Sequence, residues 1–188
     1  VSALRIFFVG PYDSIDEREP NNTPTAAQKV ALNTTVQGTL AADDEDWFAV
    51  EASAGQRLSF EIEGARLGRT MLDPVLVLRD AAGKVVAKSD DTPLLGHDAF
   101  ISVVAPAAGT YTLQLRDAVY SGNGHVYRLH IGDFARPGVT FPLGGQAEGP
   151  VTLTRRITEE SHRKFRSRLP TQRESHPRPR EVADVQPI

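Results

Sequence analysis

Oxygen-bearing side chains gather at the two ends of residues 16–48, and they carry the clearest capacity for chemistry in this sequence. The first cluster mixes acids with amides, at Glu17, Glu19, Asn21 and Asn22. The second is the run Asp43, Asp44, Glu45 and Asp46, directly before Trp47 and Phe48. Carboxylate and amide oxygens are the ligands that calcium prefers, so a hairpin-like fold that joins the clusters predicts a calcium site. The alternative is that these side chains are solvated turn residues, which is their usual role.

A second acidic set lies further along the chain, at Asp73, Asp90, Asp91 and Asp98. If strands over 75–80 and 99–104 end close together, these carboxylates converge. Convergence requires a cation or a proton, because clustered like charges repel. The alternative is a pair of Asx turns at strand ends. Neither acidic set has the glycine and glutamate spacing of an EF-hand loop.

Other catalytic chemistry finds little support in the sequence. There are no cysteines, which excludes disulfides and thiolate sites. His125 and His130 are five residues apart, hence on opposite faces of a strand, so we expect no zinc site. Ser121 precedes His125 in a glycine-rich turn, but nothing supplies the third group of a triad, and neither a nucleophile elbow nor a phosphate-binding loop is present.

Hydrophobic residues alternate with polar ones over most of the chain, which is typical of half-buried strands. The alternation predicts strands over 35–40, 46–51, 57–63, 75–80, 84–88, 99–104, 110–116 and 126–131. Short turns with glycine separate them, at Gly55, Gly83, Gly109 and Gly124. We therefore predict an all-β, jelly-roll-like antiparallel β-sandwich, with a polar linker before it and a short helical turn near 25–30. Trp47 is expected to be half-exposed and packed over the calcium loop.

Charge divides the sequence into an acidic front and a basic end. Residues 1–134 carry 18 Asp or Glu and 11 Lys or Arg, whereas residues 135–188 carry 6 and 10. Residues 135–154 have two apolar patches, expected to be a linker or the start of a further β domain. Residues 155–188 are basic and proline-rich, and we expect them to be disordered. No apolar stretch is long enough to span a bilayer, so we expect no membrane insertion.

The order of these blocks resembles the bacterial pre-peptidase C-terminal domain, a family of secreted β-sandwiches that includes the collagen-binding domains of clostridial collagenases. The resemblance covers residues 13–134. It is carried by EREPNN at 17–22, by GTL and DDEDWF around the second cluster, by LDPVLVLRDAAGKVVAKSDD at 72–91, and by residues 98–134. Residues 1–12, with an apolar strand over 4–9, resemble the end of a preceding immunoglobulin-like domain.

The resemblance also implies a ligand set and a setting. Calcium-binding members take their ligands from the linker and from the turn before the aromatic strand, and the matching positions here are Glu17, Glu19, Asn21, Asn22, Thr39, Asp44 and Asp46. Collagen binding is not implied, because the tyrosines of that face are replaced by Arg116 and Ala118. The implied setting is extracellular, at the cell surface or periplasmic.

We therefore expect a non-catalytic, calcium-supported accessory domain of a secreted or cell-surface multidomain protein. Its role would be adhesion, substrate targeting or assistance to a neighbouring peptidase. The expected partners are the neighbouring domains of the same polypeptide, and an extracellular protein or polysaccharide. Two alternatives are a hydrolase fragment that uses the acidic clusters, and nucleic-acid binding through the basic tail. The tail has a single aromatic residue, Phe165, which weighs against nucleic acid.

Overall fold

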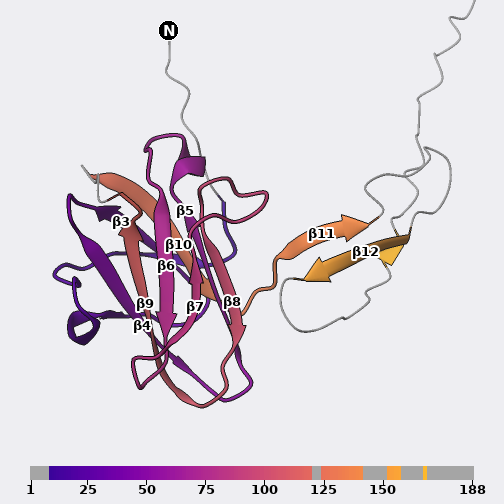
Figure 1. Cartoon of the computed structure of the whole chain (residues 1–188), viewed down its shortest axis with the longest axis horizontal. Coiled ribbons are helices and arrows are strands. Elements are labelled where there is room, and N and C mark those ends of the chain that lie inside the picture. Colours follow the sequence, from indigo (N-terminus) through magenta and orange to yellow (C-terminus); the bar gives the residue numbers. More distant parts are fainter. Residues whose placement is uncertain (1–8, 120–123, 142–151, 158–166, 169–188) are drawn as a thin grey trace, which may run out of the picture.

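Two packed β-sheets make up most of the protein (Figure 1). The computed structural model describes residues 9–119, 124–141, 152–157 and 167–168. Within them each of the two sheets has five strands, and a further small sheet follows. The predicted all-β sandwich is confirmed. No helix in the described part of the chain has the length and apolarity to cross a membrane.

The first sheet has the strand order β1-β3-β10-β5-β8. Its strands are β1 (Asp13–Asp16), β3 (Thr34–Leu40), β10 (His125–Gly132), β5 (Arg57–Glu63) and β8 (Phe100–Val104). Neighbours are antiparallel except β1, which runs parallel to β3. Tyr127 of β10 pairs with Gly38 of β3, and this register matters for the site described below.

The second sheet has the order β2-β4-β9-β6-β7. Its strands are β2 (Gln28–Lys29), β4 (Glu45–Ala52), β9 (Gly109–Asp117), β6 (Pro74–Arg79) and β7 (Val85–Ser89). Here β2 runs parallel to β4, and the other pairs are antiparallel. Each sheet thus gains one short parallel strand from residues 13–29, the leading segment of the sandwich.

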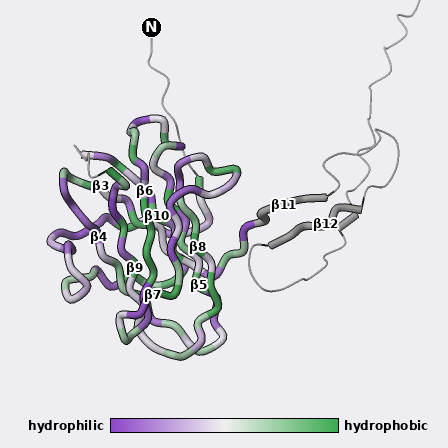
Figure 2. Tube along the Cα trace, viewed as in Figure 1, coloured by the Kyte–Doolittle hydropathy of each residue, from purple (hydrophilic) through white to green (hydrophobic). Residues whose placement is uncertain are grey.

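Side chains from alternate positions of both sheets fill the space between them. Phe48, Phe60 and Leu113 are fully buried there, together with leucines, isoleucines and valines of the neighbouring strands. Burial of apolar area on this scale is the main force that holds two sheets together. Figure 2 shows hydrophobic stretches along the packed strands and hydrophilic ones in several connecting loops.

Three local expectations need correction. The segment expected to be a polar linker begins with strand β1, because its backbone adds to the edge of β3. The helical turn near 25–30 is a single 3-10 turn at Pro24–Ala26, after which Gln28 and Lys29 are extended. Trp47 is buried rather than half-exposed: the guanidinium of Arg79 lies 5.8 Å from its ring centre, a cation–π contact, and its indole nitrogen donates to Glu45.

After the sandwich come β11 (Pro137–Phe141), β12 (Thr152–Ile157) and β13 (Ser167–Arg168), which form the third sheet. Figure 1 shows β11 and β12 beside the sandwich rather than within it. The boundary predicted at residue 155 falls inside β12. The rest of the expected disordered tail, residues 158–166 and 169–188, lies outside the described residues, as do most of the strand expected over 4–9 and Ser121.

Candidate metal site

The acidic clusters predicted to meet do so at one end of the sandwich. The first cluster contributes Glu17, which directly follows β1, and Glu19, while the second contributes Asp46, the second residue of β4. Asp46 has the same orientation as Phe48 and Val50, so it points between the sheets and is fully buried. Ligand atoms of Glu17, Glu19 and Asp46 all lie within 4.8 Å of one another. The hairpin-like meeting expected from the sequence is therefore present in the structure.

Tyr127 connects these two carboxylates. It lies on β10 and points inward, and its hydroxyl oxygen is 2.6 Å from Oδ2 of Asp46 and 2.7 Å from Oε1 of Glu17. A hydroxyl has one proton to donate, so it donates to one carboxylate at a time. In the absence of a cation, a second proton on Glu17 or Asp46 is needed for both carboxylates to be hydrogen-bonded at the same time.

Glu17 and Glu19 are fixed by the chain around them. The other oxygen of Glu17, Oε2, accepts the backbone N–H of Thr39 at 2.9 Å, while Oε1 also accepts from the side-chain amide of Asn21 at 3.2 Å. Glu19 Oε2 accepts the backbone N–H of Asn21 at 2.8 Å. The backbone carbonyl of Asn21 in turn accepts from Trp47 N–H at 2.9 Å. These bonds fasten residues 17–21 to both sheets.

The remaining predicted ligands occupy the rim of this cluster. Asp44 is buried in the turn before β4, where its carboxylate accepts the backbone N–H groups of Ala41 and Glu45 and the side-chain amide of Asn22. Its neighbour Asp43 is exposed in the left-handed region, with φ of 55°. Of the predicted ligands, the structure thus brings together Glu17, Glu19, Asn21 and Asp46. Asn22 and Asp44 form a hydrogen bond beside them. Thr39 contributes its backbone N–H, which donates to Glu17.

The electrostatics of the cluster oppose three free negative charges. Burial, together with a hydrogen bond to Glu17 and the charge of Glu17, raises the pKa of Asp46 to about 9, although the Tyr127 hydroxyl opposes the shift. Burial, together with the charges of Asp46 and Glu17, also raises the pKa of Tyr127 well above its ordinary value. Without a cation, Asp46 therefore holds a proton at neutral pH.

Two buried oxygen atoms without hydrogen-bond partners indicate whether a cation fits this cluster. Oδ1 of Asp46 and Oδ1 of Asn21 are both inaccessible to solvent and have no hydrogen-bond partner among the described residues. Buried oxygens are normally satisfied, and leaving one unpaired costs about 1–3 kcal/mol. Unpaired carboxylate and amide oxygens beside Glu17 and Glu19 are the donor set that calcium takes. The residues present therefore fit a calcium ion.

Two further residues of the site are not expected from the sequence. Alternation places Tyr127 in the core, and the signal that points to the site is its hydroxyl, which needs a polar partner once the ring is buried. Gly38 provides the space: a Cβ atom at this position would lie 2.8 Å from Glu17 Oε2 and would overlap the Tyr127 ring. A glycine inside a strand often marks this kind of close approach.

The second acidic set divides into two. Asp73 and Asp91 come together, with His97 as a third possible ligand. Asp98 is instead fully buried and accepts the backbone N–H groups of Gly64, Ala65 and Arg66, as well as the Arg66 guanidinium. The Oδ1 atom of Asp90 accepts the backbone N–H of Asp91, the next residue, rather than the N–H two residues on that an Asx turn requires.

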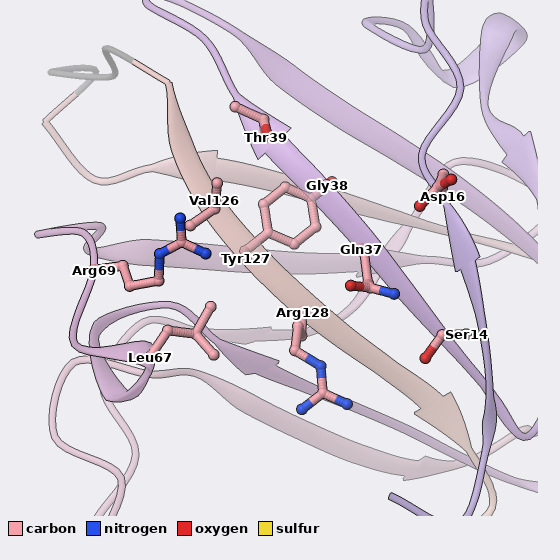
Figure 3. Close-up of a pocket in the computed structure, with 10 residues that line it drawn as sticks. All are labelled: Ser14, Asp16, Gln37, Gly38, Thr39, Leu67, Arg69, Val126, Tyr127 and Arg128. Atoms are coloured by element: carbon pink, nitrogen blue, oxygen red, sulfur yellow. The ribbon is translucent and has the colours of Figure 1, made fainter. Parts of the chain in front are cut away.

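A polar hollow of about 500 Å³ lies on the first sheet, over β1, β3 and β10. Figure 3 shows Arg69, Leu67 and Val126 on one side of it, Asp16 and Ser14 on the other, and Gln37 between them. Arg128, also in the lining, forms an ion pair with Glu63 at 2.8 Å. No described side chain in this hollow has the geometry of a nucleophile and its base.

Fold and site define a class of protein: a β-sandwich whose leading segment is fastened to both sheets by an oxygen-rich cluster. Residues 44–117 match the family model described as the bacterial pre-peptidase C-terminal domain. The resemblance stated from the sequence is therefore confirmed over these residues, which are similar to this family. The match includes Asp44 and Asp46 but begins after Glu17, Glu19 and Asn21.

One similar protein is a probable subtilase-type serine protease of Deinococcus radiodurans, which is 32% identical over 104 residues. The alignment covers 54% of this chain but only 14% of the protease. Among solved structures, the pre-peptidase C-terminal domain of a Bacillus anthracis collagenase has a TM-score of 0.46 and 18% identity, over 56% of this chain and 93% of that one. PliG of Aeromonas hydrophila, a periplasmic inhibitor of g-type lysozyme, has a TM-score of 0.44 and 16% identity, over 56% of this chain and 96% of that one. Likeness at this level says nothing about function.

Proposed function

We propose that this β-sandwich is a non-catalytic accessory domain of a larger secreted or cell-surface protein, and that calcium stabilises it at the Glu17–Asp46 site. The proposed role is adhesion, substrate targeting or assistance to a neighbouring peptidase, with an extracellular protein or polysaccharide as partner. The family match and the protease relative support the association with peptidases.

One observation carries the metal part of the proposal: Oδ1 of Asp46 and Oδ1 of Asn21 are buried without partners beside two more carboxylates. Calcium supplies the positive charge that these oxygens lack. Glu17, Glu19, Asn21 and Asp46 are the residues that would hold it. The Tyr127 hydroxyl and the Thr39 N–H orient Glu17 by hydrogen bonds. The hydrogen bond between Asn22 and Asp44 lies at the edge of the site.

The proposed consequence of calcium binding is mechanical. Glu17, Glu19 and Asn21 belong to the leading segment, Asp46 to the second sheet and Tyr127 to the first. An ion bound by the acidic members joins these parts of the chain. Because the unfolded chain has no such site, the free energy of binding adds to the free energy of unfolding.

The buried position of the acidic cluster supports a non-catalytic role. Carboxylate pairs of glycosidases act on a bond that lies between them in an open cleft. Here Asp46 is fully buried, and Tyr127 lies between it and Glu17. A substrate bond between the two carboxylates would have to displace Tyr127, which favours the accessory role over the hydrolase alternative.

Calorimetry of the purified chain tests the proposal. Calcium at about one hundred times its Kd should add about 2.7 kcal/mol to the free energy of unfolding, which corresponds to an increase in Tm of roughly 5–10 °C for a chain of this size. Calcium should also slow proteolysis after Lys29 and Arg18 in the leading segment. Magnesium, which demands a tighter octahedral site, is the control ion and should add much less.

An unchanged Tm between calcium and chelator would remove the metal from this proposal while leaving the fold intact. Turnover of polysaccharides or peptides by the purified chain would overturn the non-catalytic role.

A further inference from the structure

A second group of metal-ligand side chains lies apart from the Glu17–Asp46 site, at the ends of three other strands. Asp73 directly precedes β6, Asp91 follows β7 by two residues, and His97 precedes β8 by three. The Nδ1 atom of His97 is 3.4 Å from Oδ1 of Asp91 and 3.7 Å from Oδ1 of Asp73. All three donor atoms lie within 4.8 Å of one another.

The backbone fixes the places of these residues. Asp73 N–H donates to the buried Asp117 carboxylate at 3.2 Å, and its carbonyl accepts from Ala118 N–H at 2.7 Å. The loop that joins Asp91 to His97 is closed by a bridge between Thr92 and Gly96. The Thr92 hydroxyl also accepts the N–H of Phe100 at 2.9 Å. This closed loop therefore places His97 beside the carboxylates of Asp73 and Asp91.

We propose that Asp73, Asp91 and His97 bind a divalent transition-metal ion, with zinc as the representative. This differs from the expectation of no zinc site, which rests on the spacing of His125 and His130. A donor set of two carboxylates and one imidazole carries two negative charges when the histidine is neutral, which one divalent ion balances. Among the described residues, neither carboxylate pairs with a lysine or arginine. His97 is thus the single cationic or metal-directing group beside them.

Distances and donor type favour zinc over calcium at this site. Ligands of a tetrahedral zinc ion, at about 2.0–2.2 Å from the metal, are roughly 3.4 Å apart, close to the two separations from His97 Nδ1. Imidazole nitrogen suits zinc, copper and nickel, whereas calcium takes six to eight oxygens. Three protein donors on an exposed surface leave one position of a tetrahedral ion open for water or for a donor from a neighbouring molecule.

The test is isothermal titration of the full chain with zinc in saturating calcium, so that the Glu17–Asp46 site contributes no zinc signal. The expected result is binding of one zinc ion, with a Kd raised at least roughly tenfold in His97→Gln and in Asp91→Asn. The matched control is Asp90→Asn, because Asp90 is adjacent in sequence but outside the donor group; its Kd should stay within about twofold of the unaltered chain. Cobalt, added in place of zinc, should give visible absorption that His97→Gln abolishes.

Two results would overturn the proposal. The first is no zinc binding up to about 1 mM, which would show that His97 is only an ion-pair partner of the two aspartates. The second is zinc binding that His97→Gln leaves unchanged, which would place the ion elsewhere. His97 and Asp91 are largely exposed, with side chains 68% accessible, so both variants should fold.

Discussion

The Tyr127 hydroxyl lies 2.6 Å from Asp46 Oδ2 and thereby joins the two sheets at a buried point. Tyr127 belongs to β10 of the first sheet and Asp46 to β4 of the second. The same hydroxyl reaches Glu17, which belongs to neither strand. One side chain therefore couples the packing of the sandwich to the position of the leading segment, and each prediction about the metal site depends on this coupling.

Asp46→Asn should separate stability from calcium response. In the calcium-free protein Asp46 is protonated at neutral pH, because burial raises its pKa to about 9, so a neutral amide of the same shape should change the free energy of unfolding by less than about 1 kcal/mol. Calcium should no longer raise the Tm, since the charge that attracts it is gone. Calorimetry with and without calcium measures both effects. A variant that still gains the full calcium increment would remove Asp46 from the ligand set.

The pH dependence of stability should differ between the calcium-free and calcium-bound protein. The ordinary pKa of an aspartate is 3.8, and burial raises the pKa of Asp46 to about 9 in the folded state. Between these values the folded chain holds a proton that the unfolded chain has lost. The free energy of unfolding should therefore fall as pH rises through this window, by at most about 1.4 kcal/mol per pH unit. Urea unfolding between about pH 5 and pH 9 measures the slope.

Calcium should flatten this slope, because the ion replaces the proton. Asp46→Asn is the matched control and should flatten it without calcium, which separates Asp46 from the histidines that titrate in the same range. Equal slopes for the unaltered chain and the variant would assign the pH dependence to other groups.

Most of the strands can be predicted from the alternation of hydrophobic and polar residues in the sequence. Which strands become neighbours cannot be predicted in this way. The pattern around Phe48 and Val50 predicts β4 and an inward position for Asp46. It does not predict that Tyr127, 81 residues later in the chain, lies opposite, because that depends on which strands become neighbours. Trp47 shows the same limit: alternation places it on the outer face, yet Arg79 from β6 covers it.

The predicted ligand set shows where resemblance helps and where it stops. Glu17, Glu19 and Asn21 have no periodic signal, and only the resemblance singles them out. The role of Gly38 follows from a contact that exists only after β3 and β10 pair. The strand β1 has no signal in the sequence because Asp13–Asp16 has exposed side chains throughout, and its position comes from backbone pairing to β3.

Gly38→Ala should disrupt the site while leaving the core intact. The added Cβ would lie 2.8 Å from Glu17 Oε2 and would overlap Tyr127, so the side chains of both residues must shift from their places in the site. We expect a loss of about 1–3 kcal/mol in the free energy of unfolding and at least a roughly tenfold weaker response to calcium. Gly55→Ala is a useful comparison, because its Cβ would have open space although its φ of 79° adds backbone strain. It should lower stability without changing the calcium response, and an equal loss of response in both variants would contradict the role given to Gly38.

Asp98→Ala should destabilise the fold without affecting the Glu17–Asp46 site. Asp98 is fully buried and accepts two backbone N–H groups at 2.9 Å, from Gly64 and Ala65, besides its bonds to Arg66. Removing the carboxylate leaves these two backbone donors unpaired, while Arg66 keeps its ion pair with Glu61 at 2.9 Å. Each buried donor without a partner costs about 1–3 kcal/mol. Urea unfolding measures this loss, and the increment from calcium should stay the same as in the unaltered chain. If Asp98→Ala had the same free energy of unfolding as the unaltered chain but lost its response to a metal, Asp98 would be a metal ligand, as predicted for the second acidic set.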